Sequence, residues 1–175
     1  MKRFFPTALP LAALLAACQT VDEQPTARLG QATLRLANGL PAGTAQLLAA
    51  GNEVNISIAG VGISPGTHGV HLHTTGSCDA PGFESAGGHL NPGNREHGSA
   101  NPGGAHLGDL PNLITGNLGT GTVSATLPGP RDALLSQLFD ADGTAVVIHA
   151  SPDDYRTDPS GSSGARIACG VLTRT

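Results

Sequence analysis

Histidine is the residue type whose number and spacing carry most of the chemistry in this chain. There are seven histidines, and one aspartate shares their pattern: His68, His71, His73, His89, His97, His106, Asp109 and His149. Neutral imidazole is the commonest protein ligand of copper and zinc. Six imidazoles and one carboxylate suffice for two adjacent ions if one imidazole serves both. The pattern therefore predicts a two-metal site, and only His68 is left without a place among the ligands.

The first ligands lie in a short apolar segment. His71 and His73 are two residues apart, so on an extended chain both imidazoles project from the same face. His149 ends a second apolar run, residues 146–148, and could join them from a neighbouring strand. These three imidazoles predict a copper site.

The remaining ligands lie in a long stretch, residues 74–115, that is rich in Gly, Pro, Asn and Ser. A loop of that length is normally functional or disordered, and four potential ligands inside it favour order. The four are His89, His97, His106 and Asp109, and three nitrogens with one oxygen suit tetrahedral zinc. We assign the shared imidazole to His89 because it comes first among them, nearest Cys78.

Short extended runs between turn signals would position these residues. The runs are 31–37, 44–50, 53–59, 69–73, 122–127, 144–149 and 166–173. The first three predict a meander, and Val54, Ile56 and Ile58 alternate cleanly with polar residues. Only residues 132–138 have helical character, with Asp132 as a candidate N-cap. Strands at this spacing predict an all-β antiparallel sandwich or barrel with long metal-binding loops.

Composition indicates one compact domain, since 39% of the 175 residues are hydrophobic and 13% are charged. With 25 Gly, 13 Pro and no Trp, the apolar core is built from small aliphatic side chains. A core of that kind benefits from a covalent or metal staple.

The N-terminus predicts export. A basic start, Met1 to Arg3, precedes an apolar run at 4–14 and the small residues of Leu15-Ala16-Ala17-Cys18. This resembles a bacterial lipoprotein signal, which implies removal of residues 1–17 and a lipid on Cys18. Residues 18–29 would then be a flexible tether and 30–175 the domain. The alternatives are an ordinary signal peptide or an anchor helix, but the run is too short to span a bilayer.

Export makes disulfides possible, and with Cys18 assigned to lipid we expect Cys78 and Cys169 to be bridged. Closing so long a loop is worth about 4 to 5 kcal/mol in the chain-entropy model; two buried free thiols are the alternative. Without its leader the chain has seven arginines, no lysine and thirteen acidic residues, a formal charge of −6. This acidic balance argues against nucleic acid as a partner.

Five segments together resemble the copper/zinc superoxide dismutases, in particular the bacterial, lipid-anchored kind. They are G-T-H-G-V-H-L-H-T-T-G-S-C at 66–78, S-A-G-G-H-L-N-P at 85–92, A-H-L-G-D-L-P-N at 105–112, V-V-I-H-A at 146–150 and G-A-R-I-A-C-G-V at 164–171. The resemblance covers about residues 31–173. It implies an eight-stranded antiparallel Greek-key barrel or sandwich of immunoglobulin-like type.

The resemblance also implies a role for each residue of the site. Copper would be bound by His71, His73, His89 and His149, and zinc by His89, His97, His106 and Asp109. Arg166 would dock superoxide beside copper, and His89 would be the bridge that hands over a proton. Asp153 would link ligands of the two metals through hydrogen bonds. His68 would tie loop to barrel, and Cys78–Cys169 would be the family disulfide.

The implied activity converts two superoxide anions and two protons to oxygen and hydrogen peroxide by Cu(II)/Cu(I) cycling. The protein would protect the bacterial cell envelope as a monomer or homodimer, held to the membrane, on its periplasmic or extracytoplasmic face, through Cys18. Steering of superoxide would depend on arginines such as Arg95 and Arg156, because no lysine remains. A non-enzymatic copper- or zinc-handling lipoprotein on the same fold is the alternative. A cell-surface adhesion module would leave the ligands unexplained.

Overall fold

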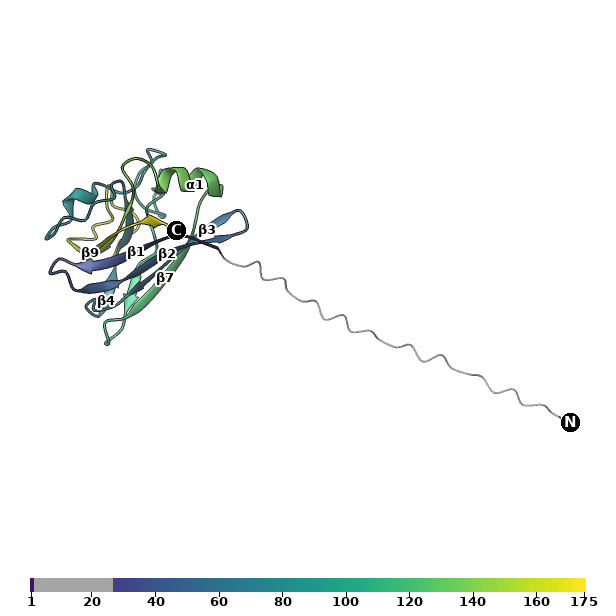
Figure 1. Ribbon diagram of the computed structural model, residues 1–175, viewed down its shortest axis with the longest axis horizontal. Coiled ribbons are helices and arrows are strands. Elements are labelled where there is room, and N and C mark those ends of the chain that lie inside the picture. Colours follow the sequence, from purple (N-terminus) through teal and green to yellow (C-terminus); the bar gives the residue numbers. More distant parts are fainter. Residues whose placement is uncertain (2–26) are drawn as a thin grey trace.

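The structure is a computed structural model that describes Met1 and residues 27–175. The predicted signal peptide after Met1, the lipidation site Cys18 and most of the predicted tether lie outside the described residues. Figure 1 shows the strands wrapped into a curled sheet, with a single α-helix across one end and long loops at the opposite side.

Ten β-strands, one α-helix and one 3-10 helix make up the described fold. They are β1 (Ala27–Leu36), β2 (Pro41–Ala50), β3 (Glu53–Gly60), β4 (Gly66–His68), β5 (Val70–His73), η1 (Glu84–Ala86), β6 (Leu113–Thr115), β7 (Gly121–Leu127), α1 (Arg131–Leu138), β8 (Ala145–His149), β9 (Arg166–Val171) and β10 (Thr173–Arg174). The main sheet has eight strands in the order β5-β8-β9-β1-β2-β3-β7, with β10 beside β1, and β4 pairs with β6 in a second sheet. The predicted all-β, eight-stranded antiparallel fold is confirmed.

The predicted meander is formed by β1, β2 and β3, which pair antiparallel in sequence. Along β3 the side chains of Val54, Ile56 and Ile58 are buried while their neighbours reach the surface. This period of two places one face of each strand on the aliphatic core. The core also includes Leu34, from β1, and Leu47, from β2.

Several predicted boundaries were wrong. Residues 27–29 were assigned to the tether, but Ala27 pairs with Ala49 and the Leu29 carbonyl accepts a hydrogen bond from Thr175 N–H. The pairing partners lie far away in the sequence, so a local pattern could not show them. The run 69–73 corresponds to β5, and β4 precedes it as a strand that was not predicted. The run 166–173 is broken at Leu172 into β9 and β10.

The helix starts one residue earlier than expected. Pro130 in an extended conformation is the N-cap, and Asp132 is the second residue of the helix rather than its cap. Proline suits this position because a helix needs no N–H donor there. The helix buries Leu134 and Leu138 against the sheet.

Strands β5 and β8 are buried on both faces. Their apolar side chains, such as Leu72 and Ile148, join the main core. Their other face meets a smaller cluster in which Phe83 and Ala86 of the long loop pack on Val147. This outer covering encloses the histidines of β5 and β8 although they face away from the core.

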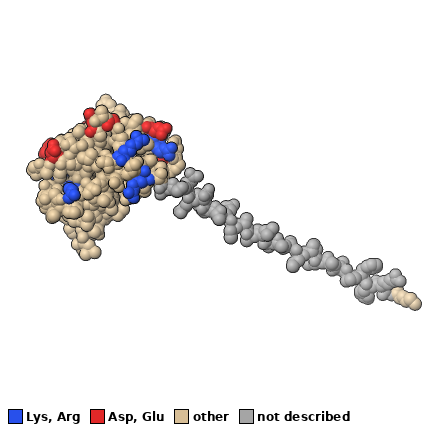
Figure 2. Space-filling view, viewed as in Figure 1, with Lys and Arg blue, Asp and Glu red and all other residues tan. Residues whose placement is uncertain are grey.

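A disulfide between Cys78 and Cys169 joins the long loop to β9, with 5.7 Å between the two Cα atoms. The expected bridge is therefore present. Charged side chains are sparse on the face in Figure 2, where most of the surface is tan. Among the described residues, no helix has the length and apolar character required to cross a membrane.

Candidate metal centre

The sheet register brings three histidines together. His71 of β5 lies opposite Val147 of β8, and the segment continues to His73 opposite Ala145. His149 ends β8, and its N–H donates to the Gly69 carbonyl just before β5. All three imidazoles are at least 96% buried. We call His71, His73 and His149 the strand ligand set.

Each of these imidazoles has one nitrogen without a hydrogen-bond partner among the described residues. These atoms are His71 Nδ1, His73 Nε2 and His149 Nε2, and His89 Nε2 is a fourth. One ligand atom from each of the four residues lies within 4.8 Å of the others. Buried polar atoms are normally satisfied, so four unsatisfied nitrogens around one point fit a copper ion. Imidazole is a favoured ligand of that metal.

The second set converges on a single carboxylate oxygen. The Nδ1 atoms of His89, His97 and His106 lie 3.0, 3.0 and 3.2 Å from Asp109 Oδ1. The His97 contact is too misaligned for a hydrogen bond and leaves that nitrogen unpartnered. Ligands of tetrahedral zinc with bonds of about 2.1 Å lie about 3.4 Å apart. This spacing fits zinc, and we call His97, His106 and Asp109 the loop ligand set.

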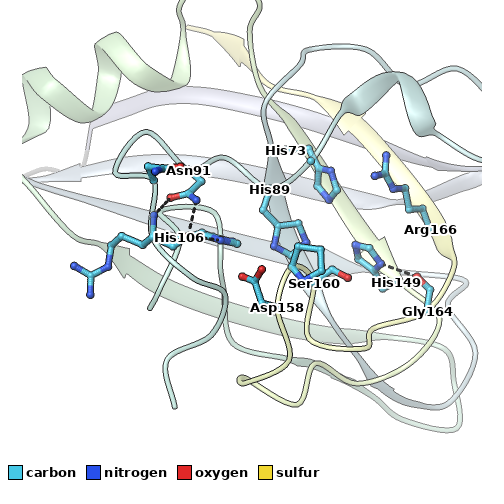
Figure 3. Close-up of a pocket in the computed structure, with 13 residues that line it drawn as sticks. His73, His89, Asn91, His106, His149, Asp158, Ser160, Gly164 and Arg166 are labelled. Carbon is cyan, nitrogen blue, oxygen red and sulfur yellow. Dashed lines mark hydrogen bonds between the residues drawn. The ribbon is translucent and has the colours of Figure 1, made fainter. Parts of the chain in front are cut away.

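His89 lies between the two sets, and Figure 3 shows it between His106 on one side and His73 and His149 on the other. Its Nδ1 faces Asp109 and its Nε2 faces the strand ligand set. In the described part of the chain, the only hydrogen-bond partner of a His89 ring nitrogen is Asp109, itself a member of the second set. This is the placement required of one imidazole that serves two ions.

The other ligand imidazoles have partners that hold the proton away from the metal side. His73 Nδ1 donates to the Gly87 carbonyl and His149 Nδ1 to the Gly164 carbonyl, at 2.9 and 3.1 Å. His106 Nε2 donates to the Arg95 carbonyl at 3.1 Å. Such partners select the tautomer and the ring orientation that metal binding needs.

A buried carboxylate links the two sets. Asp153 Oδ2 accepts from His71 Nε2 at 2.8 Å, and Asp153 Oδ1 accepts from His97 Nε2 at 3.0 Å. Gly161 lies against the Asp153–His97 hydrogen bond with a φ of 64°, and a Cβ at this position would overlap both side chains. Only glycine therefore fits at that point. Asp153 therefore contacts one imidazole of each ligand set.

Burial keeps the imidazoles neutral. Loss of hydration lowers the pKa of His89 from 6.5 to about 4 and that of His149 to about 3, and it lowers the pKa of His73 further. Burial alone would raise the pKa of Asp109, but a hydrogen bond from His89 and two backbone N–H groups hold it well below its usual value. Neutral imidazoles beside an ionised carboxylate are the protonation states that metal ligands require.

Arg166 lies at the start of β9, opposite His149. Its guanidinium donates to the Phe83 carbonyl at 2.6 Å and to the Gly87 carbonyl at 2.7 Å. The Gly87 carbonyl therefore holds both Arg166 and His73. In Figure 3 the Arg166 side chain lies beside His73 and His149, so an anion on its guanidinium would be next to the strand ligand set.

A pocket of about 570 Å³ exposes the site. Its lining includes His73, His89, His106, His149, Arg95, Asp158 and Arg166. Of the two arginines expected to steer superoxide, Arg95 lines the pocket and Arg156 does not. The Arg95 guanidinium also donates to the Gly104 carbonyl, so part of its role is structural.

His68 lies apart from the ligands. Its two ring nitrogens face the carbonyls of His149 and Ser64, at 2.8 and 2.9 Å. It therefore ties β4 to the end of β8.

Three further contributors were not predicted. The carbonyls of Phe83 and Gly87 orient Arg166, and Asn112 exchanges two hydrogen bonds with the Asp153 backbone, at 2.9 Å each. Backbone carbonyls carry no signature in the sequence. Asn112 ends the segment A-H-L-G-D-L-P-N, which is the one signal that could have identified it.

Comparison with known proteins gives one consistent family. A sequence model of the copper/zinc superoxide dismutase family matches residues 41–172. Copper/zinc superoxide dismutase 1 of Aquifex aeolicus is 41% identical over 133 residues, covering 74% of this chain and 79% of that protein.

A second relative carries a more guarded name. The superoxide dismutase-like protein of Bacillus subtilis is 47% identical over 124 residues, which cover 68% of this chain and 62% of that protein. A crystal structure of a dismutase-like protein from the same species matches with a TM-score of 0.77 at 40% identity. It covers 84% of this chain and all of the other.

Proposed function

The chain belongs to the copper/zinc superoxide dismutase family, and we propose that it removes superoxide in the bacterial cell envelope, where a lipid on Cys18 holds it. Family membership makes it an oxidoreductase that acts on superoxide and binds copper and zinc. The assignment of individual residues to these metals, the reaction steps and the location are the proposal.

The observation that carries the proposal is the position of His89. Its two nitrogens face two complete ligand sets, and Arg166 lies beside one of them in the same pocket. We assign copper to His71, His73, His89 and His149, and zinc to His89, His97, His106 and Asp109. Bound copper would supply the one-electron redox change that zinc, a closed-shell ion, cannot.

Arg166 would bind the substrate anion. Its guanidinium is fixed by two carbonyls, so it needs little reorganisation when superoxide arrives. A fixed positive charge that is partly buried in a pocket wall acts more strongly than one surrounded by water. The pocket would therefore concentrate a small anion beside the strand ligand set although the whole chain is acidic.

His89 would handle the proton. Within residues 27–175 no hydrogen-bond partner of its Nε2 is found, so this nitrogen could take up a proton and donate it to a substrate oxygen in the pocket. Asp153 would keep His71 and His97 aligned while His89 changes protonation. Two protons are needed for each peroxide, and His89 would provide one of them.

The envelope location is supported by three features. The N-terminal segment resembles a lipoprotein signal, the mature chain would keep an even pair of cysteines, and these form the Cys78–Cys169 bridge. Disulfides persist in oxidising compartments. Mass spectrometry of the membrane fraction tests the anchor: Cys18 should carry lipid, and Cys18→Ser should leave no lipidated form.

Pulse radiolysis of the purified chain, loaded with one copper and one zinc, tests the activity. The second-order rate should approach the diffusional ceiling of about 10⁸ to 10⁹ M⁻¹s⁻¹. No acceleration with both sites filled would instead favour copper or zinc handling without catalysis. Metal handling is the second candidate function because one relative is named only dismutase-like.

A further inference from the structure

The Arg95 carbonyl holds a ligand imidazole from a segment that has no regular secondary structure. His106 must keep its proton on Nε2 if Nδ1 is to bind a metal, and the acceptor of that proton is the Arg95 carbonyl, 3.1 Å away. A carbonyl on an irregular loop can hold a ring only if the loop itself is held. The Arg95 backbone must therefore be held in place by further contacts.

The side-chain amide of Asn91 holds both backbone polar groups of Arg95. Asn91 Nδ2 donates to the Arg95 carbonyl at 2.8 Å, and Asn91 Oδ1 accepts from Arg95 N–H at 3.0 Å. Figure 3 shows the Asn91 amide beside His106, with these two hydrogen bonds dashed. The carbonyl that receives the His106 proton is thus locked by a second donor.

Asn91 can do this because the residue before it is fixed to the barrel. Leu90 N–H donates to the Leu72 carbonyl of β5 at 2.8 Å, and the Leu90 carbonyl accepts from Gly108 N–H at 2.9 Å. Asn91 also follows His89 by two residues. Because the backbone at residues 90 and 91 is fixed to β5, the Asn91 amide can in turn fix the Arg95 backbone beside His106.

We propose that Asn91 is a positioning residue for zinc: its side-chain amide holds the Arg95 carbonyl that orients His106. This rests on the proposed assignment of His106 as a zinc ligand. Loss of such outer hydrogen bonds typically lowers metal affinity by about 10- to 100-fold. Asn91 is half-buried and the Arg95 guanidinium also secures the loop at Gly104, so we expect the lower end, about tenfold.

The test compares the metal affinities of Asn91→Ala with those of three other variants of the mature, disulfide-bonded protein. Asn94→Gly is the matched control, because Asn94 lines the same pocket at a φ of 47° that glycine adopts freely. Asn91→Gln restores both amide groups one carbon further out. His106→Ala is the reference for loss of the ligand itself. Zinc and copper affinities are measured by chelator competition, and NMR follows exchange of the imidazole N–H protons.

Asn91→Ala should lower zinc affinity about tenfold, leave copper affinity within twofold, and speed exchange of the His106 Nε2 proton but not that of His97. Asn91→Gln should recover part of the zinc affinity, and Asn94→Gly should match the native chain. Unchanged zinc affinity in Asn91→Ala, or equal losses for both metals, would overturn the inference. If His106→Ala binds zinc as well as the native chain does, the proposed ligand set fails first.

Discussion

The two ligand sets are built on different supports. His71, His73 and His149 stand on paired strands, where backbone hydrogen bonds fix their relative positions. His97, His106 and Asp109 stand on a loop in which side chains, a disulfide and single backbone contacts replace the ladder. The strand set is therefore held by the backbone ladder of the sheet, whereas the loop set is held together mainly by contacts with Asp109. Metal removal should loosen the second region more than the first.

The largest expected effect is the loss of activity when a strand ligand is removed, compared with the loss of stability when a loop ligand is removed. His149→Ala removes a strand ligand, and superoxide decay should fall to the uncatalysed rate because no redox-active ion is held. His106→Ala should keep copper and part of the activity but lose zinc-dependent stabilisation of about 3 to 4 kcal/mol at saturating zinc. Metal analysis, pulse radiolysis and chemical denaturation measure these outcomes. Equal loss of activity in both variants would contradict the distinction.

Asp153 should couple the metal affinities of the two ligand sets, because it accepts hydrogen bonds from His71 and from His97. Asp153→Asn removes the charge that holds His71 and His97, so both metal affinities should fall by about 10- to 100-fold. The neighbouring exposed carboxylate offers a matched control in Asp154→Asn, which should leave both affinities unchanged. Chelator competition for each ion gives the answer. An effect confined to one metal would show that the sets are coupled elsewhere.

Arg166 is positioned by both a strand and the long loop. Its backbone begins β9, and the loop carbonyls of Phe83 and Gly87 accept hydrogen bonds from its guanidinium. Arg166→Ala should lower the catalytic rate by about tenfold while copper content stays the same, because a charged hydrogen bond of about 1.5 kcal/mol is lost. Arg174→Ala, which removes an exposed arginine of β10 that does not line the pocket, is the control. Pulse radiolysis with metal analysis decides. An unchanged rate would end the docking role.

The smallest effect concerns acid and the metal-free protein. The pKa values of His89 and His149 are lowered to about 4 and 3 in the fold, whereas unfolded histidine titrates near 6.5. As pH falls below 6.5 the unfolded chain takes up protons first, so stability is lost between pH 6.5 and about 3, where His149 also becomes protonated in the fold. The two histidines together should lower the free energy of unfolding by about 1.4 kcal/mol between pH 7 and pH 6 in denaturant titrations. Metal-loaded protein should change less over this range, because both ions hold the imidazoles neutral.

The strand support was predictable from the sequence, and most of the loop support was not. A period of two along His71-Leu72-His73 places both rings on one face, so the first set could be inferred from local chemistry. The approach of three Nδ1 atoms to one Asp109 oxygen depends on the path of a long loop, which contacts far away in the sequence determine. The Gly87 carbonyl that orients Arg166 and His73 has no side chain to reveal it. The start of β1 differed for the same reason as the loop, because its partners Ala49 and Thr175 lie far away in the sequence.

His89 directs one ring nitrogen toward each ligand set, and this has a consequence for metal loading. A neutral imidazole has a single lone pair, so the first ion to arrive takes it and leaves the proton on the opposite nitrogen. The second ion can use that nitrogen only after the proton departs. Loading of the second metal should therefore release one more proton than loading of the first at His89. Its apparent affinity should then rise more steeply with pH, whichever metal comes first.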